Sequence, residues 1–204
     1  MLVYYGTFLE FFEFVLFAIM FPVLSQNLSH YFSLSDLASL QYGLFWIGFM
    51  GRPLGAFVLS PFGDRISRKK ILVISIMGMA FATIMLGCVP FTLNPWITIV
   101  YIGIFRLLQG IFTGVEYAVA TVYMYERHHQ NPKAQSHAIV NLGVMAALGT
   151  GAAYLVGAFC HLDYLNVIHF WRAAFILIGF LSLWTGGLRL SRLADDYTHL
   201  KTHQ

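Results

Sequence analysis

The chain has 204 residues, of which 58% are hydrophobic and 10% are charged, and its mean hydropathy is +0.70. An average soluble domain is about 25% charged, so this sequence has too little charge to cover a water-facing surface. The composition therefore argues against a soluble enzyme and against a nucleic-acid-binding protein. Two cysteines exclude a disulfide scaffold and a multi-cysteine metal site, and we expect no metal and no cofactor.

Runs without Asp, Glu, Lys or Arg mark the predicted membrane spans, because a charge at the bilayer centre costs about 2.5 kcal/mol or more. The longest run, residues 71–105, is too long for one crossing of roughly 20 residues, and a Pro-rich turn at residues 90–95 divides it. The sequence predicts an all-α membrane protein, with a six-helix transmembrane domain over residues 1–190 and a tail at 191–204. The helices are expected near residues 2–24, 38–62, 71–90, 96–125, 136–160 and 168–190.

Basic residues predict the orientation of these spans. Most of the 12 Lys and Arg residues fall on one side of the predicted membrane. They are Arg65, Arg68, Lys69, Lys70, Arg127, Lys133, Arg189, Arg192 and Lys201. By the positive-inside rule both termini are expected to be cytoplasmic. The basic pI of 8.9 then reflects membrane topology rather than a nucleic-acid surface.

Ionisable residues inside the predicted spans are the first functional candidates. They are Glu10, Glu13, Arg52, Arg106 and Glu116. Such residues are untenable when isolated in lipid, so they are expected to face the bundle interior or a water-filled cavity. Glu10 and Glu13 share one helix face, an arrangement suited to reversible protonation. The alternative is that some of these charges form structural ion pairs that fix helix rotation.

Small residues at four-residue spacing predict close approach of helix backbones. These residues are Gly51 with Gly55, Gly110 with Gly114, and Gly143 with Ala147 and Gly151. The pattern favours tight packing and specifies no function.

Motifs of membrane enzymes are absent from the sequence. Ser25, Ser60, Ser75 and Ser182 lie in no Gly-x-Ser-x-Gly context, and no His-Glu-x-x-His occurs. We therefore expect that the chain is not an enzyme.

Residues 51–55 (Gly-Arg-Pro-Leu-Gly) and 63–69 (Gly-Asp-Arg-Ile-Ser-Arg-Lys) resemble the signature loop of the major facilitator superfamily. Its pattern is Gly-x-x-x-Asp-Arg-x-Gly-Arg-Arg or Lys. Ser60 and Ser67 stand where that loop has glycines. The resemblance implies that the basic and acidic residues of this loop form a cytoplasmic gating network.

Two further stretches resemble the metabolite:proton symporter branch of that superfamily, which includes transporters of the proline/betaine, citrate and 2-oxoglutarate type. Residues 106–117 are similar to its run Arg-x-x-Gln-Gly-x-x-x-Gly-Gly-Glu-Trp, with Val115 and Tyr117 as departures. Residues 6–14 are similar to Gly-Asn-x-x-Glu-Trp-x-Asp-Phe. The resemblance implies an integral membrane protein of the bacterial inner (plasma) membrane.

The function implied by the resemblance is secondary active transport of a small organic acid, amino acid or betaine coupled to protons. The candidates for substrate binding and proton coupling are Glu10, Glu13, Arg52, Arg106, Gln109 and Glu116. The candidates for the gating loop are Asp64, Arg65, Arg68 and Lys69.

The superfamily's fold has two six-helix halves with the substrate between them, and this sequence matches the first. Two such units can pair about an axis along the membrane normal, so we expect a half-transporter that works as a homodimer or with a separate second-half chain. The expected partners are the solute, protons and membrane lipid. The alternative is a non-transporting truncated remnant or a membrane interaction scaffold.

Overall fold

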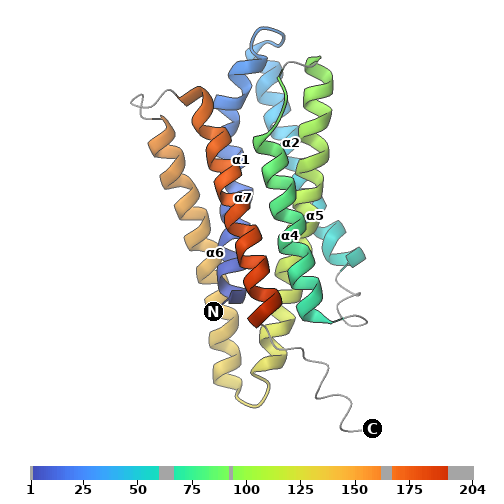
Figure 1. Cartoon of the computed structure of the whole chain (residues 1–204), viewed down its shortest axis with the longest axis vertical. Coiled ribbons are helices and arrows are strands. Elements are labelled where there is room, and N and C mark those ends of the chain that lie inside the picture. Colours follow the sequence, from blue (N-terminus) through green and yellow to red (C-terminus); the bar gives the residue numbers. More distant parts are fainter. Residues whose placement is uncertain (1, 60–66, 92–93, 162–166, 193–204) are drawn as a thin grey trace.

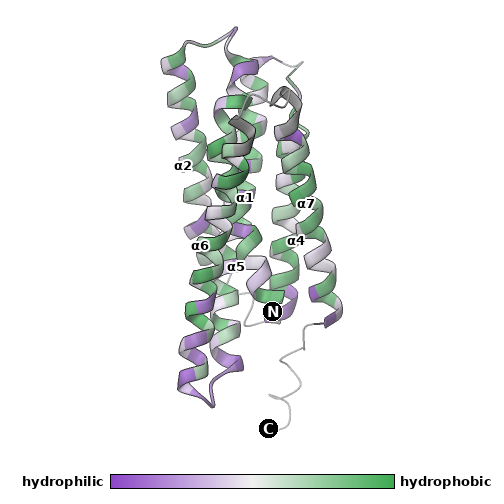
Figure 2. Ribbon diagram, turned by 90° about the vertical axis from the view of Figure 1, so that its left-hand side faces the viewer, coloured by the Kyte–Doolittle hydropathy of each residue, from purple (hydrophilic) through white to green (hydrophobic). Residues whose placement is uncertain are grey.

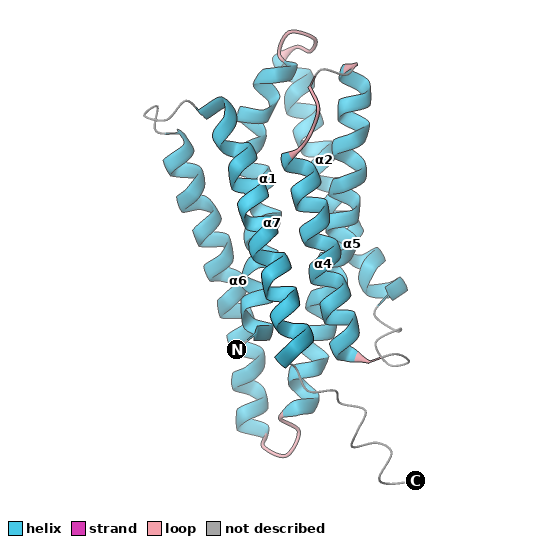
Figure 3. Cartoon of the chain, viewed as in Figure 1, coloured by secondary structure: helices cyan, strands magenta, loops and turns pink. Residues whose placement is uncertain are grey.

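The computed structural model describes residues 2–59, 67–91, 94–161 and 167–192, and helices are the only regular elements within these ranges (Figure 3). Six of the helices are long and apolar enough to cross a membrane, which confirms the predicted fold class. They are α1 (Leu2–Ser25), α2 (Leu34–Leu59), α4 (Arg68–Gly87), α5 (Pro95–Arg127), α6 (Pro132–His161) and α7 (Val167–Arg192), and a short 3-10 turn η1 (Gln26–Leu28) follows α1.

Two of the helices begin at Asn-Pro pairs. The side chain of Asn94 accepts a hydrogen bond from the backbone N–H of Trp96 at 2.9 Å, and Pro95 is the first residue of α5. The side chain of Asn131 likewise accepts from the backbone N–H of Lys133 at 3.1 Å at the start of α6. An asparagine cap satisfies a free backbone donor, and a proline at the first helical position has no donor to lose.

The second helix begins four residues earlier than the expected start at residue 38. Asp36 suggested a boundary because it is charged, but it lies within the first turn of α2. The Ser33 hydroxyl accepts from the N–H of Asp36 at 3.2 Å, and the Asp36 carboxylate accepts from the N–H of Ser33 at 3.2 Å. This reciprocal cap places an acid at the N-terminal end of the helix, where its charge is favourable.

Helix α1 lies at the centre of the bundle. It packs mainly against α6 and α7, while α2 packs on α5 and α4 packs on both α5 and α7. The start of α1 and the end of α7 lie at the same end of the bundle (Figure 1). The orientation of that end in the membrane stays a prediction.

Glycines allow α2 and α5 to touch through their backbones, as the four-residue spacing predicts. A Cβ atom at Gly110 would lie 2.0 Å from the carbonyl oxygen of Gly48, and one at Gly114 would lie 2.0 Å from that of Arg52. A side chain of any size would therefore force the helices apart. The contact places Arg52 of α2 directly beside α5.

The predicted close approach of α6 through Gly143, Ala147 and Gly151 is wrong. Gly143 and Gly151 have open space where a Cβ would stand, and Ala147 is exposed. Instead Gly149 approaches α1, since a Cβ there would lie 2.2 Å from the carbonyl oxygen of Phe8. The helix contains two small-residue faces, and only packing decides which one meets α1.

Apolar side chains also cover the outside of the bundle, as a membrane requires. Phe57 is 84% exposed and Trp184 is 69% exposed, while the hydrophilic residues of α5 and α6 gather at their joined ends (Figure 2). Inside the bundle, one apolar cluster surrounds Phe17 and Trp171 and a second surrounds Val119. Along α1 Glu13 lies between Phe12 and Leu16 of the first cluster, and along α5 Glu116 lies between Val115 and Val119 of the second.

Candidate functional site

Glu13 is the point at which three helices share hydrogen bonds. Its side chain on α1 is fully buried. Its carboxylate oxygens accept from the hydroxyl of Thr83 on α4 and from the hydroxyl of Ser182 on α7. A buried carboxyl group requires such partners because its desolvation costs several kcal/mol. These two hydroxyl partners were not anticipated from the sequence.

The same network reaches Arg106 through Gln109, and both residues lie on α5. The Gln109 side-chain amide donates to Thr83 Oγ1 at 2.8 Å, and Arg106 Nη1 donates to Gln109 Oε1 at 2.5 Å. Two intervening side chains therefore connect Glu13 to Arg106. Both Arg106 and Gln109 are fully buried.

Arg52 and Arg106 share one aromatic ring, and we call them the arginine pair. The guanidinium carbon of Arg52 lies 3.8 Å from the ring centre of Phe14, and that of Arg106 lies 4.6 Å from it. Stacking of this kind is typical of arginine. No described residue accepts a hydrogen bond from Nε or Nη2 of either arginine. The pair therefore presents unused donors inside the bundle.

Glu10 is buried, and neither of its carboxylate oxygens has a hydrogen-bond partner among the described residues. The groups that act on it electrostatically are Glu13 on its own helix, Arg52 on α2, Glu116 on α5 and Arg189 on α7. The shared face predicted for Glu10 and Glu13 is therefore buried, but the two carboxyls have different surroundings. The Glu13 carboxylate accepts hydrogen bonds from two hydroxyl groups, whereas the Glu10 carboxylate accepts none from the described residues.

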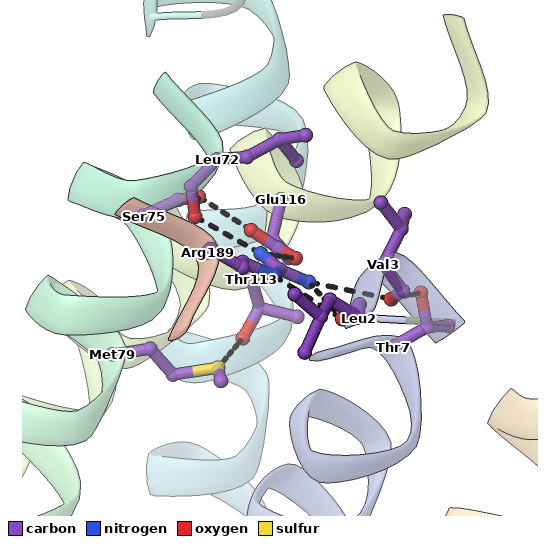
Figure 4. Close-up of polar contacts among 9 residues, drawn as sticks. All are labelled: Leu2, Val3, Thr7, Leu72, Ser75, Met79, Thr113, Glu116 and Arg189. Carbon is purple, nitrogen blue, oxygen red and sulfur yellow. Dashed lines mark hydrogen bonds and ion pairs between the residues drawn. The ribbon is translucent and has the colours of Figure 1, made fainter. Parts of the chain in front are cut away.

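Glu116 forms a buried ion pair with Arg189, which we call the Glu116–Arg189 pair (Figure 4). Arg189 Nη1 lies 2.5 Å from Glu116 Oε1, and the Ser75 hydroxyl donates to Glu116 Oε2 at 2.5 Å. The guanidinium also donates to the backbone carbonyls of Leu2, Val3 and Leu72. All three side-chain nitrogens of Arg189 thus have acceptors.

The placement of Arg189 corrects an expectation. The sequence predicts that Arg189 flanks the last span, but it lies in the last turn of α7 and its side chain is fully buried inside the bundle. Arg192, one turn later, is exposed. The long side chain of a basic residue near a helix end can extend to the membrane surface or into the bundle. Here it extends into the bundle, where it pairs with Glu116.

Of the four gating-loop candidates, the structure describes Arg68 and Lys69. Asp64 and Arg65 lie outside the described residues. Arg68 begins α4 and forms two contacts with Glu126 at the end of α5, from Nε at 2.6 Å and from Nη2 at 2.7 Å. Lys69 follows in the first turn of α4. The Arg68–Glu126 contact therefore ties the start of one helix to the end of the next.

Sequence reasoning missed four site residues: Ser75, Thr83, Ser182 and Arg189. The three hydroxyl residues carried a weak signal, since each is a polar residue in an apolar run. Such residues are frequent in membrane helices and usually bond to their own backbone, so position alone does not distinguish the two that bond to Glu13.

Comparison with known proteins agrees with this architecture. The sequence profile of the Major Facilitator Superfamily matches residues 3–199. The chain is 29% identical over 154 residues to the ectoine/proline transporter ProP of Corynebacterium glutamicum. This alignment covers 72% of this chain and 30% of that protein. It is 36% identical over 128 residues to the citrate-proton symporter of Klebsiella pneumoniae, covering 59% of this chain and 28% of that protein.

A solved structure shows the same fold. The proton:xylose symporter XylE bound to 6-bromo-6-deoxy-D-glucose superimposes with a TM-score of 0.79 at 16% identity, over 93% of this chain and 43% of that one. The chain thus spans less than half the length of each of these proteins. The matches are to transporters rather than enzymes, and the chain is an integral multi-pass protein of the bacterial inner (plasma) membrane. With six membrane-spanning helices and a profile match along nearly its whole length, the chain belongs to the Major Facilitator Superfamily.

Proposed function

We propose that this chain contributes one half of a secondary active transporter that moves a small organic solute together with protons. The solute class is an organic acid, an amino acid or a betaine. The names of the bacterial relatives support this class, since one transports ectoine and proline and another is a citrate-proton symporter. A second six-helix bundle, from a second copy or from a separate partner, completes the solute pathway.

The observation that carries the proposal is the hydrogen-bonded position of Glu13. A carboxylate there accepts from the hydroxyls of Thr83 and Ser182, so it joins three helices. A protonated carboxyl becomes a donor and can no longer accept in the same way at both oxygens. Proton binding therefore changes which contacts hold α1 to α4 and α7. Such a change biases an equilibrium between two helix arrangements.

The experiment is uptake into proteoliposomes with an imposed proton gradient, using radiolabelled proline and citrate as probes. We expect Glu13→Gln to abolish gradient-driven accumulation, because the amide cannot release a proton, and Arg106→Ala to do the same by breaking the network. Asp36→Asn is the matched control, since Asp36 is an exposed capping residue and asparagine also caps helices. Accumulation that persists without a gradient would contradict proton coupling.

The source of the second bundle is tested by native mass measurement in mild detergent. We expect either a homodimer or a complex with a second membrane chain. A purified assembly of either kind that accumulates neither probe would instead favour the non-transporting scaffold.

The gating role of Asp64, Arg65, Arg68 and Lys69 is part of the same proposal. The contact between Arg68 and Glu126 supports it, because an exposed ion pair joining two helices can break and re-form as they move. We expect Glu126→Gln to change the rates of solute uptake and of solute efflux by the same factor. The ratio of solute inside to solute outside should stay the same, because the proton gradient sets it. A changed ratio at unchanged rates would contradict a gating role.

A further inference from the structure

A cavity of about 530 Å³, which we call the α2–α5 groove, lies at the end of the bundle where these two helices begin. Its apolar wall is formed by Leu40, Leu44 and Ile47 of α2 and by Trp96 and Ile99 of α5. The volume falls in the range of small-molecule pockets, roughly 300–1,000 Å³. Trp96 and Ile47 are exposed, so the groove opens on the outside of the bundle.

The groove exists because the two helices diverge toward their first turns. At Gly110 they touch, since a Cβ there would lie 2.0 Å from the Gly48 carbonyl oxygen. Nearer the start of α5, a Cβ at Gly103 would lie 3.7 Å from Leu44 Cδ2, which is an ordinary contact distance. Gly43 has open space where its Cβ would stand, and it lines the groove.

The groove is as long as one leaflet of a membrane is deep. It extends along α2 from Asp36 to Ile47, a rise of about 16 Å at 1.5 Å per residue. Half of a hydrocarbon core of about 30 Å is about 15 Å. The rings of Phe32 and Trp96 meet at the outer end with 5.3 Å between their centres, and tryptophan is typical of the membrane–water interface. These dimensions fit one lipid chain with its polar end at Asp36.

Asp36 is the charged residue among the described residues that line the groove. Its Oδ2 accepts from the N–H of Ser33 at 3.2 Å and from the Ser33 hydroxyl at 2.6 Å. Within the described part of the chain, no hydrogen bond reaches its Oδ1 and no Lys or Arg pairs with it. An exposed carboxylate at the membrane surface therefore keeps one oxygen for a cationic donor.

The head group, rather than the chain, decides which lipid the groove selects. Lipid tails around the bundle are as apolar as leucine, so contact with the apolar wall does not distinguish one phospholipid from another. A carboxylate attracts a head group that carries a positive charge and N–H donors, and it repels one that carries only a phosphate. The ammonium group of ethanolamine meets both requirements.

We propose that the α2–α5 groove binds a phosphatidylethanolamine molecule, with one acyl chain along α2 and the ammonium group donating to Asp36. None of the described buried charged residues lines this groove. The lipid site is therefore separate from the Glu13 network, and it goes beyond the proposed transport function. The bound chain fills the space that the diverging helices leave open.

The experiment is native mass spectrometry of the purified chain in mild detergent. The probes are phosphatidylethanolamine and phosphatidylglycerol with identical acyl chains, added in equal amounts. We expect about 5-fold more bound phosphatidylethanolamine, equivalent to about 1 kcal/mol, the upper value for an exposed ion pair. Asp36→Asn should abolish this preference, because asparagine keeps the helix cap but loses the charge.

Gly43→Leu tests the groove itself. The leucine side chain would occupy the open space, and we expect it to lower phosphatidylethanolamine binding about 5-fold or more. Leucine is more favourable than glycine inside a helix, so the variant should fold. Gly143→Leu on α6 is the matched control, since open space also surrounds that glycine and it does not line the groove. A thermal unfolding curve verifies the fold of each variant.

Three results would overturn the lipid site: equal binding of the two lipids to the folded wild type, a preference that survives Asp36→Asn, or the same loss of binding in Gly43→Leu and Gly143→Leu. The remaining occupant to exclude is a side chain of a second six-helix bundle. Release of the bound lipid when the two-bundle assembly forms would assign the groove to that bundle and overturn the lipid proposal as well.

Discussion

Two pairs of buried charges lie beside α1, and they differ in how completely their polar atoms are paired. The Glu116–Arg189 pair has an acceptor for every side-chain nitrogen of its arginine, and a serine hydroxyl completes its carboxylate. The arginine pair leaves four donor atoms without partners among the described residues. Arg106 and Arg189 are both fully buried, so the difference between these two arginines does not come from exposure to solvent.

The difference separates a charge whose polar atoms are all paired from one whose donors are only partly used. A fully hydrogen-bonded ion pair holds α5, α7 and the first turn of α1 in one arrangement, and its energy is lost only when a partner is removed. An incompletely paired buried group instead lowers the stability of the bundle around it. We therefore expect the two pairs to respond oppositely to mutation.

Arg189→Leu should have the largest effect. It leaves Glu116 as a buried charge without its cation, and breaking a buried pair in this way costs about 3–5 kcal/mol. The measurement is denaturant unfolding in detergent micelles, followed by tryptophan fluorescence. The double variant Glu116→Leu with Arg189→Met should recover most of the loss. If the double variant is as unstable as the single one, the unpaired charge is not the cause.

Gly110→Ala should rank second, because it disturbs the contact that positions the arginine pair. The added methyl group would meet the Gly48 carbonyl, and such overpacking costs about 1–3 kcal/mol. Gly143→Ala is the control, since open space surrounds that position and the change should stay within about 0.5 kcal/mol. The same unfolding assay checks both, and equal effects would contradict the close contact.

Arg52→Leu should leave stability unchanged or raise it by up to about 1 kcal/mol, because it removes a buried cation whose donors are incompletely paired. A destabilisation as large as that of Arg189→Leu would show that the two pairs do not differ in how they affect stability.

Glu126→Gln should have the smallest effect on stability. Arg68 and Glu126 are 17% and 49% exposed, and surface ion pairs contribute about 0.2–1 kcal/mol. Salt screens such pairs, so the difference between variant and wild type should shrink at high ionic strength. A difference that is independent of salt would mean that the contact acts through packing rather than through charge.

The number and approximate place of the helices were predictable from the sequence. Apolar runs of the required length can only be membrane helices in a chain with this composition, because every backbone polar group in lipid must be satisfied within a helix. The burial of Glu10, Glu13, Arg106 and Glu116 followed for the same reason, since none of them is stable against lipid. The start of α2 was misplaced because a charge inside the first turn was treated as a boundary.

The partner of each charge was decided only by the tertiary structure. Glu13 bonds to Ser182, which is 169 positions away, and Glu116 pairs with Arg189, which is 73 positions away. The sequence required that buried charges have partners, but it did not specify which helix supplies them. That choice depends on the rotation and contacts of every helix, as the two small-residue faces of α6 also show. The sequence therefore predicted the burial of Glu10, Glu13, Arg106 and Glu116, whereas packing decided the burial of Arg189 and the partner of each charge.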